Sequence, residues 1–145
     1  GFDAAINYRT ETDMVAAIAR ACPQGVDVYF DNVGGQILDA TLLNLNKDAR
    51  VVFCGAISSY NSTEPVPGPY NFWQILARSA TIEGYLVSDY LDQFPQGIAQ
   101  MRDWVSEGRL QFREQIIDGL ENTLDAFSLL FEGSNEGKLM VRVAP

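Results

Sequence analysis

Histidine is absent from this chain of 145 residues. The absence removes the commonest general base, the commonest zinc ligand and every catalytic triad built on imidazole. Any acid–base chemistry must therefore come from Tyr, Asp, Glu, Lys or Cys side chains, or from a bound cofactor.

Cysteine is scarce, and long apolar runs are missing. Cys22 and Cys54 lie far apart and belong to no Cys-x-x-Cys pair, so we expect no disulfide framework and infer a reducing compartment. No apolar run approaches the roughly 20 residues of a membrane span, and no signal-peptide pattern opens the chain. We therefore expect a soluble, cytoplasmic protein.

Positive charge is also in short supply. Ten Lys and Arg face 19 Asp and Glu, which gives a formal net charge of -9, and no block of adjacent basic residues offsets the deficit. Nucleic acid and anionic membranes are therefore poor partners. The 47% of apolar residues is enough for the core of one domain, or of a large piece of a bigger enzyme.

The opening of the chain predicts that a segment precedes it. The sequence begins at Gly1 without an initiator Met, and Ala4 to Tyr8 is interpreted as a short edge or connecting strand. A strand this close to the first residue predicts a chain that is a fragment.

Strand-like and helix-like segments alternate over the first 90 residues. Thr12 and Asp13 offer caps for the first amphipathic run, and VDVYFD at 26–31 is typical of a buried parallel strand. The order strand, helix, strand, helix, strand predicts a doubly wound α/β sheet of the nucleotide-binding kind. The predicted elements are helices at 14–22 and 36–45, a turn at 46–48, strands at 26–31, 50–55 and 81–87, a long Pro-rich loop at 56–70 and a short helix at 71–79.

The last third of the chain has a different pattern. A long amphipathic helix is predicted from about Leu91 to Glu107, and its apolar stripe includes Met101 and Trp104. This helix and the strand at 81–87 are also candidates for subunit pairing. A strand at 113–120, a helix at 122–133 and a strand at 138–144 complete a small β-α-β tail.

Ligands of open α/β sheets bind beyond the carboxyl ends of the parallel strands. Three segments of this chain follow predicted strands: Asp31 to Gly35, Cys54 to Tyr60, and Tyr85 to Val87. Gly34 and Gly35 either let a ligand approach the backbone or serve a turn that needs positive φ. Because neither a G-x-G-x-x-G nor a G-x-x-x-x-G-K-[ST] motif occurs, spacing alone predicts a ligand-binding α/β domain and no more.

Tyr60 is the most plausible acid of these segments. A phenol donates a hydrogen bond or a proton to a developing enolate oxygen, although a tyrosine packed on its own loop gives the same pattern. Cys54 ends an apolar strand without a basic neighbour, so a pocket-lining core residue is favoured over a nucleophile.

Four strings of the sequence resemble the zinc-independent medium-chain reductases. GFDAAINYRTE, CPQGVDVYFDNVGGQILDATL, ARVVFCGAISSYN and GKLMVRV occur in this order and cover essentially the whole chain. The closest branch is that of the 2-alkenal double-bond reductases, leukotriene 12-hydroxydehydrogenase and the prostaglandin reductases. The resemblance implies that no metal is bound, which accounts for the missing histidines.

The same resemblance implies a domain assignment. Residues 1–108 would be the C-terminal part of a Rossmann dinucleotide-binding domain whose first β-α unit and glycine-rich turn lie upstream. Residues 109–145 would return into a GroES-like substrate domain. We therefore expect residues 1–145 alone to bind NADPH weakly or not at all and to be inactive.

Roles carried over by motif define the predicted site. Tyr8 resembles the tyrosine beside the adenosine 2′-phosphate, Asn32 a contact near the pyrophosphate and nicotinamide ribose, and Tyr60 the catalytic tyrosine near the substrate carbonyl. Asn135, before Gly137-Lys138, resembles the C-terminal asparagine that reaches the cofactor. The implied cofactor-binding residues are Tyr8, Asn32, Cys54, Gly55, Ala56, Ile57, Ser58, Ser59, Tyr60, Tyr85, Leu86, Val87 and Asn135.

The implied reaction is reduction of a C=C bond conjugated to an aldehyde or ketone, with NADPH as the hydride donor and a homodimer as the assembly. Two other readings stay open from the residues. One is a quinone reductase of the same superfamily. The other is a non-catalytic nucleotide-binding Rossmann domain, or a methyltransferase-like one.

Overall fold

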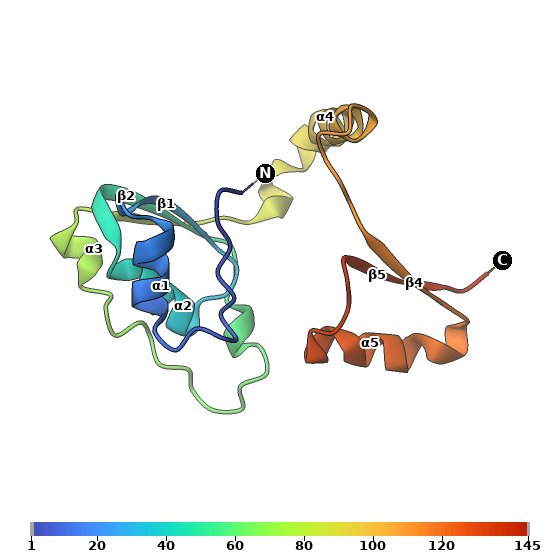
Figure 1. Cartoon of the computed structure of the whole chain (residues 1–145), viewed down its shortest axis with the longest axis horizontal. Helices are drawn as coiled ribbons and strands as arrows, with labels where there is room; N and C mark the ends of the chain where they lie inside the picture. Colours follow the sequence, from blue (N-terminus) through green and yellow to red (C-terminus); the bar gives the residue numbers. More distant parts are fainter. Residues whose placement is uncertain (1, 145) are drawn as a thin grey trace. The chain divides into compact units, whose positions relative to one another are not determined.

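A computed structural model describes residues 2–144 as a mixture of helices and parallel strands (Figure 1). The chain divides into two compact units, of which the first ends at Asp89 and the second begins at Tyr90. Each unit is described by itself below. The domain boundary predicted between residues 108 and 109 concerns which domain of the whole protein each segment belongs to. The division into compact units does not test it, so it stays a prediction.

The first unit contains the predicted parallel sheet. Its strands are β1 (Val26–Asp31), β2 (Leu45–Phe53) and β3 (Thr81–Gly84), in the order β1-β2-β3. The register places Asp31 beside Phe53 and Phe53 beside Gly84. All three strands therefore end at the same edge of the sheet.

Two helices, α1 (Met14–Ala21) and α2 (Gly35–Leu42), lie against the sheet (Figure 1). The core forms where apolar residues of both helices meet β1 and β2. Its buried members are Ile18, Val26, Leu38, Ala40, Leu42, Leu45, Ala49 and Val51. Burial of this cluster holds α2 against β1 and β2. It therefore also positions the segment before α2, which is part of the predicted site.

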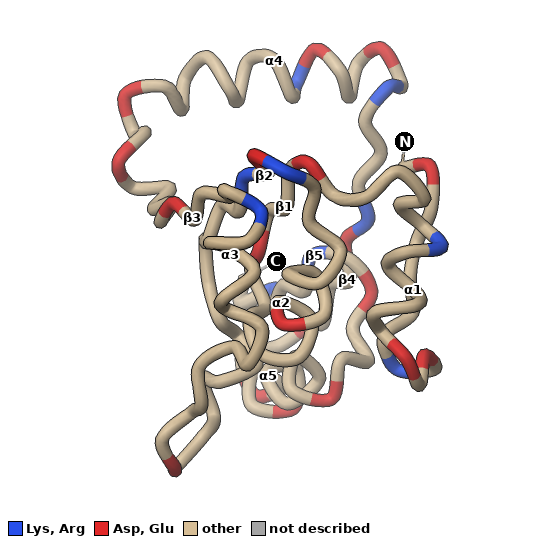
Figure 2. Tube along the Cα trace, turned by 90° about the vertical axis from the view of Figure 1, so that its left-hand side faces the viewer, with Lys and Arg blue, Asp and Glu red and all other residues tan. Residues whose placement is uncertain are grey.

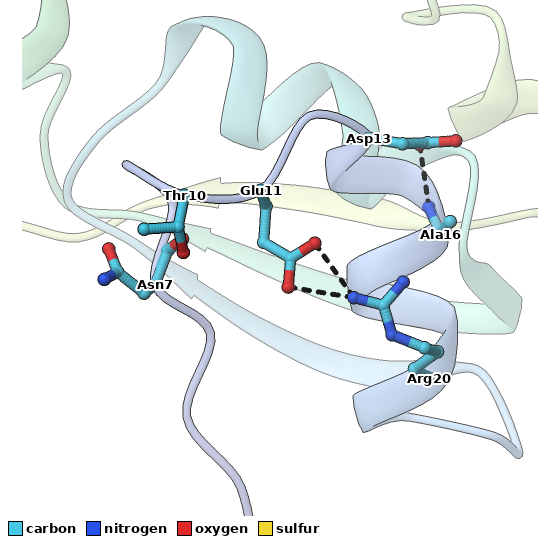
Figure 3. Close-up of polar contacts among 6 residues, drawn as sticks. All are labelled: Asn7, Thr10, Glu11, Asp13, Ala16 and Arg20. Carbon is cyan, nitrogen blue, oxygen red and sulfur yellow. Dashed lines mark hydrogen bonds and ion pairs between the residues drawn. The ribbon is translucent and has the colours of Figure 1, made fainter.

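Helix α1 begins as the sequence predicts. The Asp13 carboxylate accepts a hydrogen bond of 2.9 Å from the backbone N–H of Ala16, which satisfies one of the free donors at the helix start (Figure 3). Arg20 and Glu11 form an ion pair of 2.9 Å between the end of the helix and the segment before it (Figure 3).

The predicted strand at 4–8 is wrong. No strand forms between Phe2 and Asp13, and the chain turns at Asn7 instead, where the Asn7 carbonyl accepts hydrogen bonds from the N–H groups of Thr10 and Glu11. A strand is held by hydrogen bonds to a neighbouring strand, and no strand among residues 2–144 pairs with this segment.

The boundary between α2 and β2 also differs from the prediction. The helix predicted to continue to residue 45 ends at Leu42, because the Asn44 side chain donates to the Ala40 and Val15 carbonyls and Leu45 already pairs with Val26. The predicted turn at 46–48 lies inside an irregular part of β2, where the register shifts and Asp48 has a φ of 61°.

Three further predicted elements have different bounds in the structure. Strands β2 and β3 end at Phe53 and Gly84 rather than at 55 and 87, and helix α3 covers only Gln74–Ala77. The residues lost from both strands join the loops at the sheet edge. That edge is therefore richer in irregular backbone than the sequence pattern predicts.

The second unit contains the predicted β-α-β tail. Strands β4 (Glu114–Asp118) and β5 (Lys138–Arg142) pair in parallel and are connected through α5 (Thr123–Glu132). Helix α4 (Phe94–Ser106) precedes them, after a 3-10 segment at Val87–Gln93. The apolar stripe of α4, including Ile98 and Met101, is exposed.

Neither sign of charge is confined to one unit of the chain. Lys and Arg occur on elements of both units and are interleaved with Asp and Glu along the chain (Figure 2). Among residues 2–144, no helix combines the length and the apolar character that crossing a bilayer requires.

Candidate functional site

Two of the three predicted site segments are joined by backbone hydrogen bonds. The Asp31 carbonyl at the end of β1 accepts from the N–H of Cys54 at 2.8 Å and from that of Gly55 at 3.1 Å. The Asn32 carbonyl accepts from the N–H of Ile57 at 3.1 Å. The loop after β2 is therefore held against the turn after β1.

Ser58 completes this junction. Its N–H and its hydroxyl both donate to the Val33 carbonyl, at 3.1 Å and 2.6 Å. A Cβ built on Gly35, whose φ is +54°, would lie 2.8 Å from the Ser58 Oγ. Gly35 therefore serves a positive φ, which is one of the two explanations left open for this glycine pair, and also the close approach of the Ser58 side chain. The approach of a ligand to this backbone stays a prediction.

The Tyr60 hydroxyl lies close to Gly55 in this junction. A Cβ built on Gly55 would lie 3.2 Å from the Tyr60 hydroxyl oxygen and 3.3 Å from the Asn32 carbonyl oxygen. Glycine at position 55 thus leaves the space in which the phenol approaches the backbone. Tyr60 remains 69% exposed, so its ring is available to a ligand at the sheet edge.

The third segment lies beside the second. The N–H of Tyr85 donates to the Phe53 carbonyl at 2.9 Å, and the Tyr85 ring meets the edge of Phe30 with 5.8 Å between centroids. Leu86 and Val87 follow with exposed side chains. The residues after all three strands therefore lie along one edge, as predicted.

A cavity of about 350 Å³ opens beside this edge. One side is the start of α2, and the opposite side is the Pro-rich segment 66–70. The far end of the Pro-rich loop is tied to α2, because Asn71 donates from its backbone N–H and its side chain to the Asp39 carboxylate at 2.7 Å and 3.1 Å. From the sheet edge, Phe53, Ala56 and Ser59 contribute to the cavity lining.

Asp31 is a buried carboxylate that begins one of the predicted site segments, but sequence reasoning gave its side chain no role. It is 0% exposed, and its Oδ1 accepts hydrogen bonds from the N–H groups of Val33 and Gly34, each at 2.9 Å. Oδ2 has no hydrogen-bond partner. The signal for it was present, because an acidic residue that ends an apolar strand and precedes Asn-x-Gly-Gly is placed to accept from the turn.

Tyr29 provides the third hydrogen bond to the same oxygen. Its hydroxyl donates to the Asp31 Oδ1 at 2.9 Å. Burial and the adjacent Asp31 carboxylate raise the pKa of Tyr29 well above its usual range. The phenol therefore stays protonated and remains a donor at every pH at which the protein would normally be studied.

Two predicted site residues lie elsewhere. Tyr8 lines a separate hollow of about 280 Å³ between β1 and the two helices, together with Met14 and Tyr29. Asn135 belongs to the second unit, where its side chain donates to the Gly137 carbonyl at 3.2 Å. The structure thus brings together Asn32, the loop from Cys54 to Tyr60 and the segment 85–87. Tyr8 lines a different hollow of the first unit, and Asn135 belongs to the second unit.

Neither cysteine is bonded to the other, and both are half-buried. Within residues 2–144, no group of three or more His, Cys, Asp or Glu side chains is arranged to hold a metal ion. The N–H of Cys54 contacts the Asp31 carbonyl at 2.8 Å, which gives this residue a backbone role at the sheet edge.

Comparison with known proteins identifies the family of this chain. A family model described as zinc-binding dehydrogenase matches residues 1–106. The chain belongs to this family. Within it, the similarity to reductases described next places the chain in the zinc-independent medium-chain branch, as the four sequence strings predicted.

Two relatives of this chain are enzymes whose names state their activities. The NADPH-dependent curcumin reductase of Escherichia coli is 39% identical over 99% of this chain and 43% of its own length. The NADP-dependent 2-alkenal reductase of Nicotiana tabacum is 39% identical over 99% of this chain and 42% of its own length. The chain spans less than half the length of the curated relatives it matches.

A solved structure supports the fold over the whole chain. The crystal structure of CurA from Vibrio vulnificus in complex with NADPH matches with a TM-score of 0.87 and 37% identity, and covers 100% of this chain and 44% of that one. The fold of this chain is therefore Rossmann-like α/β, as predicted.

Proposed function

We propose that this chain carries the nicotinamide-facing part of an NADP-dependent oxidoreductase, and that the whole protein reduces the C=C bond of α,β-unsaturated aldehydes or ketones. The observation that carries the proposal is the position of Tyr60, whose hydroxyl lies close to Gly55 at the edge where three parallel strands end. The activities of the related curcumin and 2-alkenal reductases support the substrate class.

The sheet edge fits one half of the proposed cofactor. A nicotinamide ribose and carboxamide need hydroxyl, amide and exposed backbone partners. Asn32, Tyr60 and the exposed segment 85–87 offer these groups along one edge. The sequence contains no glycine-rich phosphate turn of the G-x-G-x-x-G kind, so the sheet edge is assigned to the nicotinamide half, and Tyr8 stays the predicted contact with the adenosine 2′-phosphate.

Tyr60 has a defined part in the proposed reaction. When bound, NADPH supplies a hydride to the β-carbon of the substrate. The negative charge then develops on the carbonyl oxygen at the other end of the conjugated system. The Tyr60 hydroxyl donates a hydrogen bond to that oxygen, which lowers the energy of the enolate because the donor is already in place. A proton from solvent then adds to the α-carbon and completes the saturated carbonyl product.

The loop around Tyr60 restricts its movement. The hydrogen bonds of Ile57 and Ser58 to the turn after β1 hold the loop at two consecutive residues, and the N–H of Tyr60 donates to the Ile57 carbonyl at 3.3 Å. A donor held in this way loses little entropy when the enolate forms. The Pro-rich segment 66–70 lines the adjoining cavity, which gives an apolar substrate a surface away from water.

The domain assignment is part of the same proposal. Residues 1–108 contribute the later strands of the Rossmann domain, and residues 109–145 return into a GroES-like substrate domain. A homodimer and a cytoplasmic location stay predictions. The mass of the whole protein by light scattering tests the first of these, and a mass of one chain contradicts it.

Substitution of Tyr60 by Phe tests the catalytic role. In the whole protein, Tyr60→Phe removes only the hydroxyl, so kcat for a trans-2-alkenal should fall by at least about tenfold, which is the usual range for a positioned donor. The KM for NADPH should change by less than about threefold, because the aromatic ring is retained. The measurement is NADPH oxidation followed by absorbance.

Tyr90→Phe, the same chemical change in the second unit, is the matched control and should keep wild-type kinetics. A Tyr60→Phe enzyme with full turnover removes the catalytic role. A parallel assay with a quinone distinguishes an alkenal reductase from a quinone reductase, because a quinone reductase reduces the quinone and leaves the alkenal unchanged.

A further inference from the structure

The carboxylate of Asp31 is the one fully buried acidic side chain among residues 2–144. An ionised carboxylate is costly to bury unless hydrogen bonds compensate it. Three hydrogen bonds converge on its Oδ1, and Oδ2 has none. The proposed mechanism does not use this group, so its retention inside the unit needs another explanation.

The bonds to Oδ1 close the turn after β1. The N–H groups of Val33 and Gly34 both point back to the Asp31 carboxylate, each at 2.9 Å. With these two N–H groups held inside the turn, the carbonyls of Asn32 and Val33 are available to the neighbouring loop. A side chain that accepts from the two N–H groups after it is a recurrent way of fixing a turn.

The neighbouring loop depends on those two carbonyls. The Asn32 carbonyl accepts from the N–H of Ile57, and the Val33 carbonyl accepts from the N–H and the hydroxyl of Ser58. Tyr60 follows two residues later. A continuous series of hydrogen bonds therefore leads from the Asp31 carboxylate through the turn to the loop that carries Tyr60.

We propose that Asp31 is a positioning residue, whose buried carboxylate fixes the turn at 32–34 and thereby the place of the Tyr60 hydroxyl at the sheet edge. The proposal rests on the proposed function for its kinetic consequence, but its structural half stands on the hydrogen bonds alone. A direct contact with substrate or cofactor is not part of it, because neither carboxylate oxygen is accessible from the surface: the residue is 0% exposed.

Three variants of the whole protein separate this role from simple core stability. Asp31→Ala removes the acceptor. Asp31→Asn keeps a carbonyl oxygen that can accept from Val33 and Gly34, and so should rescue the turn. Tyr29→Phe is the matched control, because it removes the third donor to the same oxygen and leaves both turn N–H groups bonded.

Hydrogen exchange at single amides gives the structural readout. In Asp31→Ala, the amides of Ile57 and Ser58 should exchange at least about tenfold faster than in the wild type, whereas that of Val51 in the sheet core keeps its rate. In Asp31→Asn and Tyr29→Phe, the amides of Ile57 and Ser58 should stay within about twofold of wild type by the same reasoning. Unchanged exchange in Asp31→Ala, or equal acceleration in Tyr29→Phe, overturns the proposal.

Steady-state kinetics give the second readout. Asp31→Ala should lower kcat for a trans-2-alkenal by at least about tenfold, since misplacing a catalytic donor by a fraction of an ångström is enough for this. Asp31→Asn should recover kcat to within about threefold of wild type on the same principle, and Tyr29→Phe should lower the thermal midpoint while leaving kcat unchanged. Faster exchange at Ile57 and Ser58 with wild-type kcat contradicts the proposal.

Ser58→Ala keeps the proposal testable if Asp31→Ala does not fold. This exposed residue forms the other end of the series, and its loss should accelerate exchange at Ile57 and lower kcat in the same direction. A Ser58→Ala protein with wild-type exchange and kcat overturns the series. If Tyr60→Phe keeps full turnover, the proposed function fails, but exchange at Ile57 and Ser58 still decides the role of Asp31.

Discussion

The two units of the chain differ in how they bury their apolar residues. Every buried residue among residues 2–144 except Ala126 lies in the first unit. The second unit has regular helices and a paired sheet, yet Phe127 and Phe131 of α5 touch each other with 5.0 Å between ring centroids while both remain exposed. Secondary structure alone therefore does not make a core, and the first unit is the one whose packing positions the sheet edge.

The largest expected effect comes from matched leucines on helices of the two units. Leu42 ends α2 and is 0% exposed, whereas Leu124 in α5 is 79% exposed. Leu42→Ala should cost about 2–5 kcal/mol because it opens a cavity in the core. Leu124→Ala should cost less than about 0.5 kcal/mol, as at other surface positions. Chemical unfolding followed by circular dichroism measures both, and equal costs contradict the difference between the units.

An intermediate effect is expected where a loop is attached to the core of the first unit. Asp39→Ala removes the two hydrogen bonds that Asn71 donates to the Asp39 carboxylate and leaves the one to the Asp39 backbone carbonyl at 3.3 Å, so the Pro-rich loop should be held less firmly at its far end. We expect a loss of about 1–2 kcal/mol, as for a few hydrogen bonds to a charged group. Limited proteolysis within 61–69 should become several-fold faster, while the amide of Val51 keeps its protection.

Asp125→Ala is the control for that experiment, because it removes a carboxylate from an exposed position on α5. It should leave cleavage within 61–69 at the wild-type rate. If Asp39→Ala also left the rate unchanged, the attachment at Asn71 would not restrain the loop.

The smallest effect is expected from an ion pair in the second unit. Arg142 and Asp118 lie 2.8 Å apart across β4 and β5, with side chains 53% and 73% exposed. Solvent and salt screen such a pair, so Arg142→Gln should change the free energy of unfolding by less than about 1 kcal/mol. Thermal unfolding at low and high salt measures it. A larger loss would mean that this pair, and not apolar packing, holds the second unit together.

Local sequence patterns predicted most of the sheet. The branched and aromatic residues of 26–31 mark β1 correctly, and Gly34-Gly35 marks the start of α2. The strand at 4–8 was wrong because its identity depends on a partner strand rather than on its own residues. The end of α2 was missed for a similar reason, since it is set by the pairing of Leu45 with Val26.

The candidate site was predicted at the level of segments. The strand-end rule and the motif CGAISSYN placed the loop from Cys54 to Tyr60 at the right edge, and the structure brings Asn32 beside it. The motif did not reveal Asp31 as a residue of this junction. It also did not reveal the attachment of Asn71 to Asp39, which joins residues 32 positions apart. Contacts of this length are created by the fold and have no local signature.

The junction at the sheet edge is built mainly from main-chain groups, and this has a consequence for how the protein can diverge. Cys54, Gly55 and Ile57 all contribute backbone N–H groups to the turn after β1. Most residue types at an exposed position such as Ile57 supply the same N–H. The Ile57 side chain can therefore be exchanged while the course of the loop is kept, so the outer surface of the loop can vary without disturbing the turn after β1.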